Sequence, residues 1–101
     1  MEYTAEHLKK ITSLGTLSYG LEKCLNVLDI KNEEQFKKDF RTPGTPVYKA
    51  YKKGQDISDF AIDSKLFNLA KEGDLEALKE LNERKIKRQL EDEDNFFNEN
   101  S

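Results

Sequence analysis

The sequence has very few of the residues that build disulfides, metal centres and nucleophilic sites. Among its 101 residues there is one cysteine, Cys24, and one histidine, His7. A single cysteine excludes a disulfide within the chain and favours a reducing cytoplasm. A zinc site needs three or four ligands, and a cysteine–histidine nucleophile pair needs a shared cleft, so neither site is predicted. We expect Cys24 to be a small core residue and His7 to lie on the surface.

Long apolar runs and glycine-rich phosphate loops are missing as well. No stretch reaches the roughly 18 apolar residues of a membrane span, and the N-terminus shows no apolar run after a basic start. Without a glycine-rich loop to cradle phosphates, nucleotide hydrolysis is not expected. Asp56, Asp59 and Asp63 share one helical face, but surface carboxylates are common on charged helices. We therefore expect a soluble cytoplasmic protein that is not an enzyme and holds no cofactor or metal.

The sequence is rich in charged residues, and its apolar residues recur at helical spacing. Charged residues make up 37% of the chain and hydrophobic residues 36%, a balance that favours amphipathic helices over a thick sheet core. The predicted fold is all-α, with an N-terminal three-helix helix-turn-helix, a long helix, a C-terminal helix that completes a helical hairpin, and a disordered acidic tail. The corresponding segments are residues 1–45, 46–90 and 91–101.

The long helix has the clearest start and stop signals. Thr45 can cap its first turn, Pro46 fits the first helical position, and Gly73 suits the left-handed conformation that ends a helix. Asp74 can then cap the final helix. About 27 residues between these signals span roughly 40 Å, which favours a binding or assembly protein over a compact enzyme. Gly54, near the middle, is a place where the helix can bend.

Three shorter helices are predicted before it. Thr4 can cap the first, which we expect Gly15 to end, and Ser18 is expected to begin the second. Asn32, with Gln35 three residues later, resembles a capping box at the start of the third helix.

The second and third helices match the spacing of a helix-turn-helix, in which the later helix enters the major groove of DNA. Any three-helix core gives the same apolar spacing, and Glu33 and Glu34 open the recognition helix with charges that repel phosphate. The residues placed to contact DNA on this helix are Gln35, Lys38 and Arg41.

A second basic segment opens the long helix. Residues 31–53 contain seven basic and three acidic residues, and between positions 48 and 53 aromatic side chains alternate with lysines. Phosphate contact supported by stacking suits this pattern, although the lysines are also what a solvated helix face would carry. The candidate contacts are Lys49, Lys52 and Lys53.

The second half of the long helix is apolar on several sides, which predicts packing against other chains as well as its own. The acidic segment 91–101 has too little apolar surface to offset the entropy of ordering, so we expect it to be disordered. Phe96 and Phe97 are the exception within it and are candidates for partner binding.

Residues 70–78 read Ala-Lys-Glu-Gly-Asp-Leu-Glu-Ala-Leu. Together with the helix-turn-helix and the lysine-rich helix, this Ala-Lys-x-Gly-Asp-x-x-Ala-Leu turn resembles small phage-encoded proteins of the terminase small-subunit type over about residues 4–88. The resemblance implies a non-catalytic subunit of viral genome packaging, located in the host cytoplasm. Such a protein forms a homo-oligomer, often a ring, binds double-stranded DNA and passes it to a large terminase subunit.

The resemblance also assigns roles to residues of this chain. It adds Lys37 to Gln35, Lys38 and Arg41 as a DNA-facing position, and it makes Phe96 and Phe97 a docking site for the large subunit or another protein. The alternative from the residues alone is a small α-helical protein-interaction module, an adapter or inhibitor, that does not bind DNA.

Overall fold

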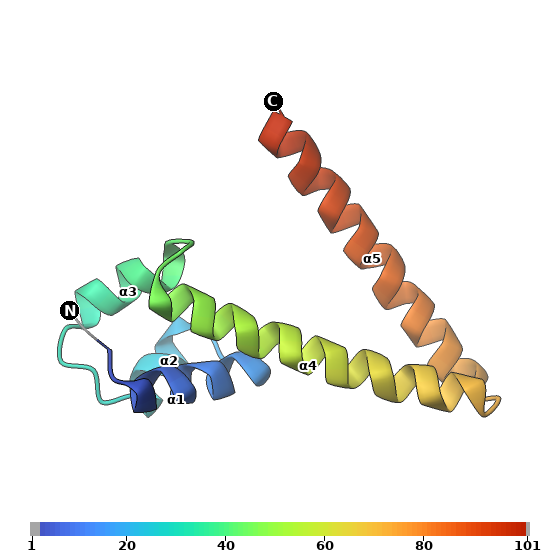
Figure 1. Cartoon of the computed structure of the whole chain (residues 1–101), viewed down its shortest axis with the longest axis horizontal. Coiled ribbons are helices and arrows are strands. Elements are labelled where there is room, and N and C mark those ends of the chain that lie inside the picture. The colour runs from blue at the N-terminus through green and yellow to red at the C-terminus, as the bar shows by residue number, and fades with distance from the viewer. Residues whose placement is uncertain (1–2, 101) are drawn as a thin grey trace. The chain divides into compact units, whose positions relative to one another are not determined.

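The computed structural model (Figure 1) describes the backbone of residues 3–100 and the side chains of residues 3–92. Over residues 3–100 the chain forms five helices and no strand, which confirms the all-α fold. The helices are α1 (Ala5–Thr16), α2 (Leu21–Val27), α3 (Glu33–Arg41), α4 (Pro46–Lys71) and α5 (Leu75–Asn100).

The chain divides into two compact units, residues 1–60 and residues 61–101, which we call the N-terminal and C-terminal units. The sequence analysis placed a boundary at residue 45, whereas the compact units divide at residue 60, within α4. The first half of α4 belongs to the N-terminal unit because Val47 is fully buried in its core.

Four helices begin at the residues that the sequence predicted. In each case the side-chain oxygen of the capping residue accepts a hydrogen bond from a backbone amide of the first turn. The caps are Thr4 at 3.0 Å, Asn32 at 3.1 Å, Thr45 at 3.2 Å and Asp74 at 3.0 Å. Gly73 ends α4 in the left-handed region, with φ at 102°, as predicted.

The predicted boundary between the first two helices was wrong. Ser18 does not begin α2; it lies in the left-handed region, with φ at 55°. Its amide donates to the Gly15 carbonyl at 3.0 Å, and the Tyr19 amide donates to the Leu14 carbonyl at 3.1 Å. This is the hydrogen-bond pattern that closes a helix, with a serine where glycine is usual. α2 begins later, at Leu21.

Gly15 does not end α1, because it lies inside the helix where α1 packs against α4. A Cβ atom at Gly15 would overlap the Tyr51 carbonyl oxygen, and one at Gly54 would overlap the Thr12 carbonyl oxygen. Both glycines are buried. Gly54 therefore allows two backbones to approach closely, and α4 continues as a helix through it.

The core of the N-terminal unit is built from all four of its helices and the loop between α2 and α3. Tyr51 and Phe40 pack edge to face beside it, with ring centroids 4.9 Å apart. The buried residues are Ile11, Leu14, Cys24, Leu28, Ile30, Phe36 and Val47. The burial of Cys24 agrees with the expectation from its position on an apolar helix face.

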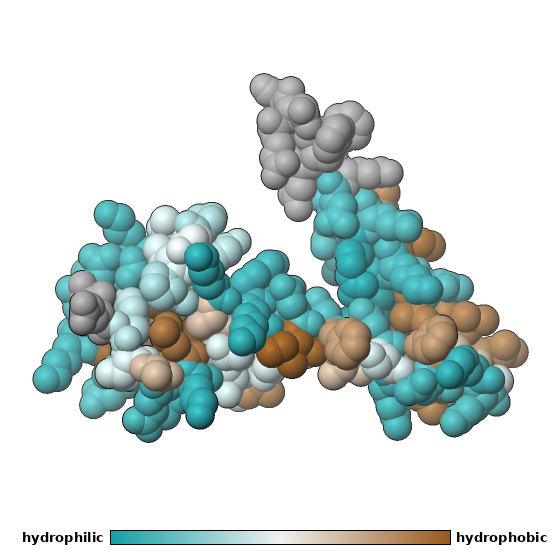
Figure 2. All heavy atoms as spheres, viewed as in Figure 1, coloured by the Kyte–Doolittle hydropathy of each residue, from teal (hydrophilic) through white to brown (hydrophobic). Residues whose placement is uncertain are grey.

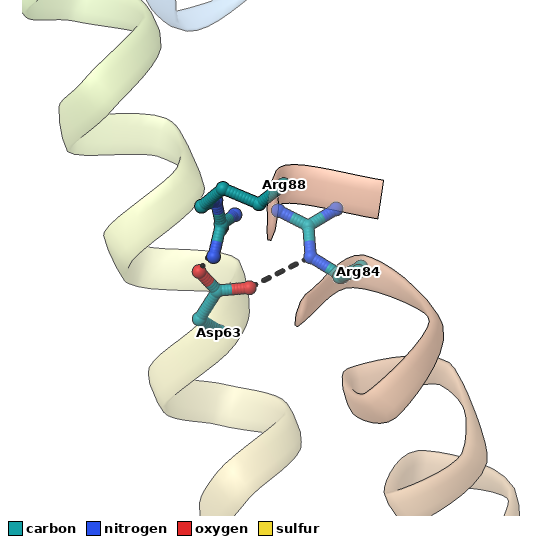
Figure 3. Close-up of polar contacts among 3 residues, drawn as sticks. All are labelled: Asp63, Arg84 and Arg88. Atoms are coloured by element: carbon teal, nitrogen blue, oxygen red, sulfur yellow. Dashed lines mark hydrogen bonds and ion pairs between the residues drawn. The ribbon is translucent and has the colours of Figure 1, made fainter. Parts of the chain in front are cut away.

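The C-terminal unit has a much smaller core, formed where the end of α4 packs against the start of α5. Only Leu66, Ala77 and Leu81 are buried there, with Leu69 packed against them. An ion-pair cluster adds to this contact, because Asp63 on α4 points toward two arginines of α5 (Figure 3).

Within the described residues, neither long helix carries an apolar stretch sufficient to cross a lipid bilayer. Helix α5 is drawn to Asn100, but side chains beyond residue 92 are not described. The prediction of a disordered acidic tail and the partner-binding roles of Phe96 and Phe97 lie outside what the structure describes.

Candidate nucleic-acid interface

Five of the seven predicted DNA-facing residues line two surface grooves of the N-terminal unit. Lys37 and Arg41 line the first groove, and Lys49, Lys52 and Lys53 line the second. Of the other two, Lys38 is exposed on α3 and Gln35 is held in an intramolecular contact. The seven residues therefore do not form one site.

The first groove, here the α3 groove, lies between α3 and the segment that joins α1 to α2. Its volume is about 750 Å³. Basic side chains reach it from two elements, because Lys23 comes from α2 while Lys37 and Arg41 come from α3. Glu22 is the one acidic residue of its lining, which otherwise consists of Leu17, Ser18, Tyr19, Gly20 and Leu21.

Lys23 was missed by the sequence analysis. Its ammonium group lies 4.9 Å from the centre of the Tyr19 ring, a cation–π contact. In a helix-turn-helix the first helix of the motif crosses the DNA backbone, so a lysine on α2 was a candidate phosphate contact from the start. The predicted contacts all lie within the basic segment 31–53, and Lys23 precedes that segment.

Two exposed acidic residues, Glu33 and Glu34, occupy the first turn of α3 and weaken its basic character, as the sequence predicted. Lys37 lies 3.7 Å from Glu34, whose side chain is 91% exposed. An ion pair this exposed contributes little and is easily exchanged for a stronger anion such as phosphate. The Glu34 carboxylate nonetheless remains on the outer part of the helix, as the sequence predicted.

Gln35 is engaged with its own chain. Its side-chain amide donates to Asp39 at 2.8 Å, and the other carboxylate oxygen of Asp39 accepts a hydrogen bond from the Tyr3 hydroxyl at 2.7 Å. Burial, followed by this hydrogen bond and the Asp39 charge, holds the pKa of Tyr3 well above its usual value. Contact between the Gln35 amide group and a base would require its hydrogen bond to Asp39 to open.

The second groove, here the α4 groove, runs along the outer face of the first half of α4 and has a volume of about 540 Å³. Lysines and apolar residues share it. Phe60 is 75% exposed and Ile57 is 48% exposed. The complete lining is Gly44, Tyr48, Lys49, Lys52, Lys53, Asp56, Ile57 and Phe60. Three lysines beside aromatic rings form a surface suited to an anionic ligand with flat apolar parts.

Two of the three aspartates that share one face of the long helix, Asp56 and Asp63, have separate surroundings. Asp56 lines the α4 groove, whereas Asp63 accepts hydrogen bonds from Arg84 Nε at 2.7 Å and Arg88 Nη2 at 3.1 Å. Desolvation by burial raises the pKa of Asp63. The Arg84 hydrogen bond and the charges of both arginines lower it, and because their combined effect is larger, the pKa of Asp63 lies below its usual value. Among the described residues, no three histidine, cysteine or acidic side chains are grouped to hold a metal ion.

Neither Cys24 nor His7 lines either groove. Cys24 is fully buried, its thiol lies 3.5 Å from the Tyr19 carbonyl oxygen, and burial raises its pKa. His7 was expected to lie on the surface, but it is half-buried. Its Nδ1 atom is buried, without a hydrogen-bond partner among the described residues.

Comparison of the chain with protein-family models, with curated proteins and with solved structures finds no match. In Figure 2 the visible surface of the N-terminal unit is mostly hydrophilic, and the C-terminal unit shows both hydrophilic and hydrophobic side chains. Large exposed hydrophobic side chains occur on both units, for example Phe60 and Leu75.

Proposed function

We propose that the chain is a non-catalytic DNA-binding assembly protein. The observation that carries this proposal is the α3 groove, in which Lys23 of α2 stands with Lys37 and Arg41 of α3. Phosphate contacts supply most of the affinity of proteins for DNA, and a helix-turn-helix uses both of its helices to make them. Three cations from two helices around one groove match that requirement.

The α4 groove supplies a second contact. Lys49, Lys52 and Lys53 bind backbone phosphates in this proposal, while Tyr48 and Phe60 offer rings for stacking. Lys38, exposed on α3, is a further contact. Gln35 contributes to base recognition only where its hydrogen bond to Asp39 opens.

The C-terminal unit mediates assembly in this proposal. Its buried core is small, and many large apolar side chains of the unit face solvent. Domains of about 40 residues usually need oligomerisation, disulfides or metals for stability. This unit has no cysteine to form a disulfide, since Cys24 is the only one in the chain.

The resemblance to terminase small subunits connects these two properties. It makes the protein an oligomer that binds viral DNA in the host cytoplasm and delivers it to a large terminase subunit. In that scheme Phe96 and Phe97 form the docking site for the large subunit. The resemblance supports the packaging role; the grooves support DNA binding on their own.

One observation favours a second function, that of a protein-interaction module. The α4 groove contains Ile57 and Phe60, and apolar side chains this exposed often mark a protein contact. A module of this kind would bind a protein through the α4 groove and would show no salt-dependent affinity for DNA.

Binding of a fluorescently labelled DNA duplex, followed by anisotropy, tests the proposed function. Replacing Lys23, Lys37 and Arg41 together by alanine removes three phosphate contacts and is expected to weaken binding at least tenfold at about 0.1 M salt. The matched control replaces Lys9 and Lys10, exposed lysines of α1 outside both grooves, by alanine. Equal losses in the variant and the control would refute a specific interface at the α3 groove.

A further inference from the structure

Helix α5 carries a row of exposed apolar side chains along one face. Leu75 is 77% exposed, Leu78 43%, Ile86 57% and Leu90 56%. With Asn82 between them, their spacings of three and four residues keep them on one side of the helix. We call this row the α5 stripe. It extends over 16 residues, or about 24 Å.

The α5 stripe is not the face that packs within the chain. Ala77 and Leu81, which are buried against α4, project from the opposite side of the helix. Arg84 and Arg88, which bind Asp63, project from that side too. The intramolecular contact of α5 therefore leaves the whole stripe in water, which indicates a partner.

The order of residues in the α5 stripe makes it complementary to the same stripe on a second copy of this chain. When a second copy of the helix runs antiparallel about a two-fold axis at Asn82, Leu78 lies opposite Ile86, four residues to either side. Leu75 then falls within one residue of Leu90. Every apolar position meets an apolar position, and the two Asn82 amides meet at the centre. A polar pair at the centre of an apolar seam fixes register and orientation.

Charges beside the stripe follow the same symmetry. One residue after Leu75, Leu78, Asn82 and Ile86 lies a parallel row of exposed charges: Glu76, Lys79, Glu83 and Lys87. Glu91, which follows Leu90, would face position 73 of the other copy, before its α5 begins. A two-fold axis between antiparallel helices brings the same flank of both helices together. About the axis at Asn82, Glu76 falls within one residue of Lys87 and Lys79 within two residues of Glu83. The charges in each pair are opposite in sign, and each pairing occurs twice in the dimer.

We infer that the α5 stripe binds the α5 stripe of a second copy of this chain, antiparallel and centred on Asn82. This inference rests on the assembly part of the proposed function and specifies its contact. It does not depend on DNA, so its test uses the full-length protein alone, and DNA affinity is measured separately on the same variants. Failure of the dimer and failure of DNA binding are thus distinguishable.

Charge reversal tests the pairing without changing the apolar stripe. Glu76→Lys places two like-charged contacts in the dimer and is expected to raise its dissociation constant by about tenfold at low salt, as is Lys87→Glu. The double variant Glu76→Lys/Lys87→Glu restores both contacts and returns the constant to near the original value. Sedimentation velocity measures association, and circular dichroism verifies that helicity is retained.

An apolar-to-charged pair of variants tests the stripe itself. Ile86→Asp is expected to make the protein monomeric at concentrations where the original chain is a dimer. The control is Val27→Asp, since Val27 is 53% exposed but lies on α2, outside the stripe. The control is expected to remain a dimer. Dimerisation that survives Ile86→Asp would overturn the inference.

Cross-linking distinguishes the antiparallel pair from any other arrangement of copies. Leu75→Cys and Leu90→Cys chains, each with Cys24→Ala, are mixed and oxidised gently. The antiparallel pair gives mainly a disulfide between positions 75 and 90, identified by mass spectrometry. A parallel pair gives 75–75 and 90–90 disulfides, which overturns the inference. A monomer at all concentrations overturns it as well.

Discussion

Replacement of Gly54 by alanine gives the sharpest test of how the N-terminal unit is held together. In an ordinary helix interior this change adds about 1 kcal/mol of stability, because alanine is the better helix former. Here the new Cβ atom would overlap the Thr12 carbonyl oxygen. It would also lie 2.9 Å from the Thr16 amide nitrogen and 3.0 Å from the Gly15 Cα atom.

All three neighbours are backbone atoms of α1 and cannot rotate away. Normal van der Waals contact requires about 3.4–4 Å, so relief of the overlap with the Thr12 carbonyl oxygen requires α1 and α4 to separate by more than about 1 Å. That separation disturbs the packing of Ile11 and Val47, both fully buried. Overpacking of this kind costs about 3 kcal/mol, which leaves a net loss of about 2 kcal/mol after the helix-propensity gain.

Urea unfolding followed by tyrosine fluorescence measures the loss of stability in the N-terminal unit. The chain has no tryptophan, and its four tyrosines all lie within residues 1–60, so tyrosine fluorescence reports on the N-terminal unit alone. A neighbouring control, Lys53→Gly, gives the cost of glycine on the exposed face of α4, about 1 kcal/mol. Stabilisation by Gly54→Ala would refute the close packing of α1 on α4. Because Gly15 shares this contact, the losses of Gly15→Ala and Gly54→Ala should not add.

Three further predictions follow from single contacts. The pKa of Asp63 is lower in the folded than in the unfolded chain. Ionised Asp63 therefore stabilises the folded C-terminal unit at pH values above its unfolded pKa of about 4, and this stabilisation is lost as the pH falls through its folded pKa. Asp63→Asn should therefore cost the C-terminal unit about 1–2 kcal/mol at pH 7, measured by circular dichroism melting, and the difference should shrink below pH 4. A thiol reagent should label Cys24 only as the N-terminal unit unfolds, since burial both raises its pKa and blocks access; immediate labelling in buffer would contradict this. Asp74→Ala should lower the stability of α5 by about 1 kcal/mol through loss of its cap, while an unchanged melting curve would show that the cap at 3.0 Å contributes nothing.

Local signals in the sequence predicted the fold well. Each cap from Thr4 to Asp74 depends on one side chain and one nearby amide, so it can be recognised without knowledge of the tertiary structure. The end of α4 at Gly73 is local for the same reason. The assignment of Gly15 failed because its role depends on α4, some forty residues away in the chain, which the local pattern does not contain.

The candidate site could be predicted only in part from the sequence. Spacing placed basic residues on α3 and α4 correctly on the surface, but it did not separate them into two grooves. The hydrogen bond between Gln35 and Asp39 is local to α3, but the Tyr3 hydroxyl that also binds Asp39 comes from outside the helix and is not part of the local pattern. The place of Lys23 in the α3 groove also depends on the tertiary structure, because it is set by how α2 meets α3.

The most direct test of the central claim is the salt dependence of duplex DNA binding, measured with light scattering of the protein alone and with DNA at about 50 and 200 mM salt. Contacts with several phosphates release counterions, so a protein that uses Lys23, Lys37 and Arg41 together with the α4 lysines should lose affinity by about a hundredfold or more between these conditions. A defined oligomer with that dependence is the result that the proposed function predicts. A protein that does not bind the duplex at 50 mM salt would contradict it and leave the protein-interaction module as the better explanation.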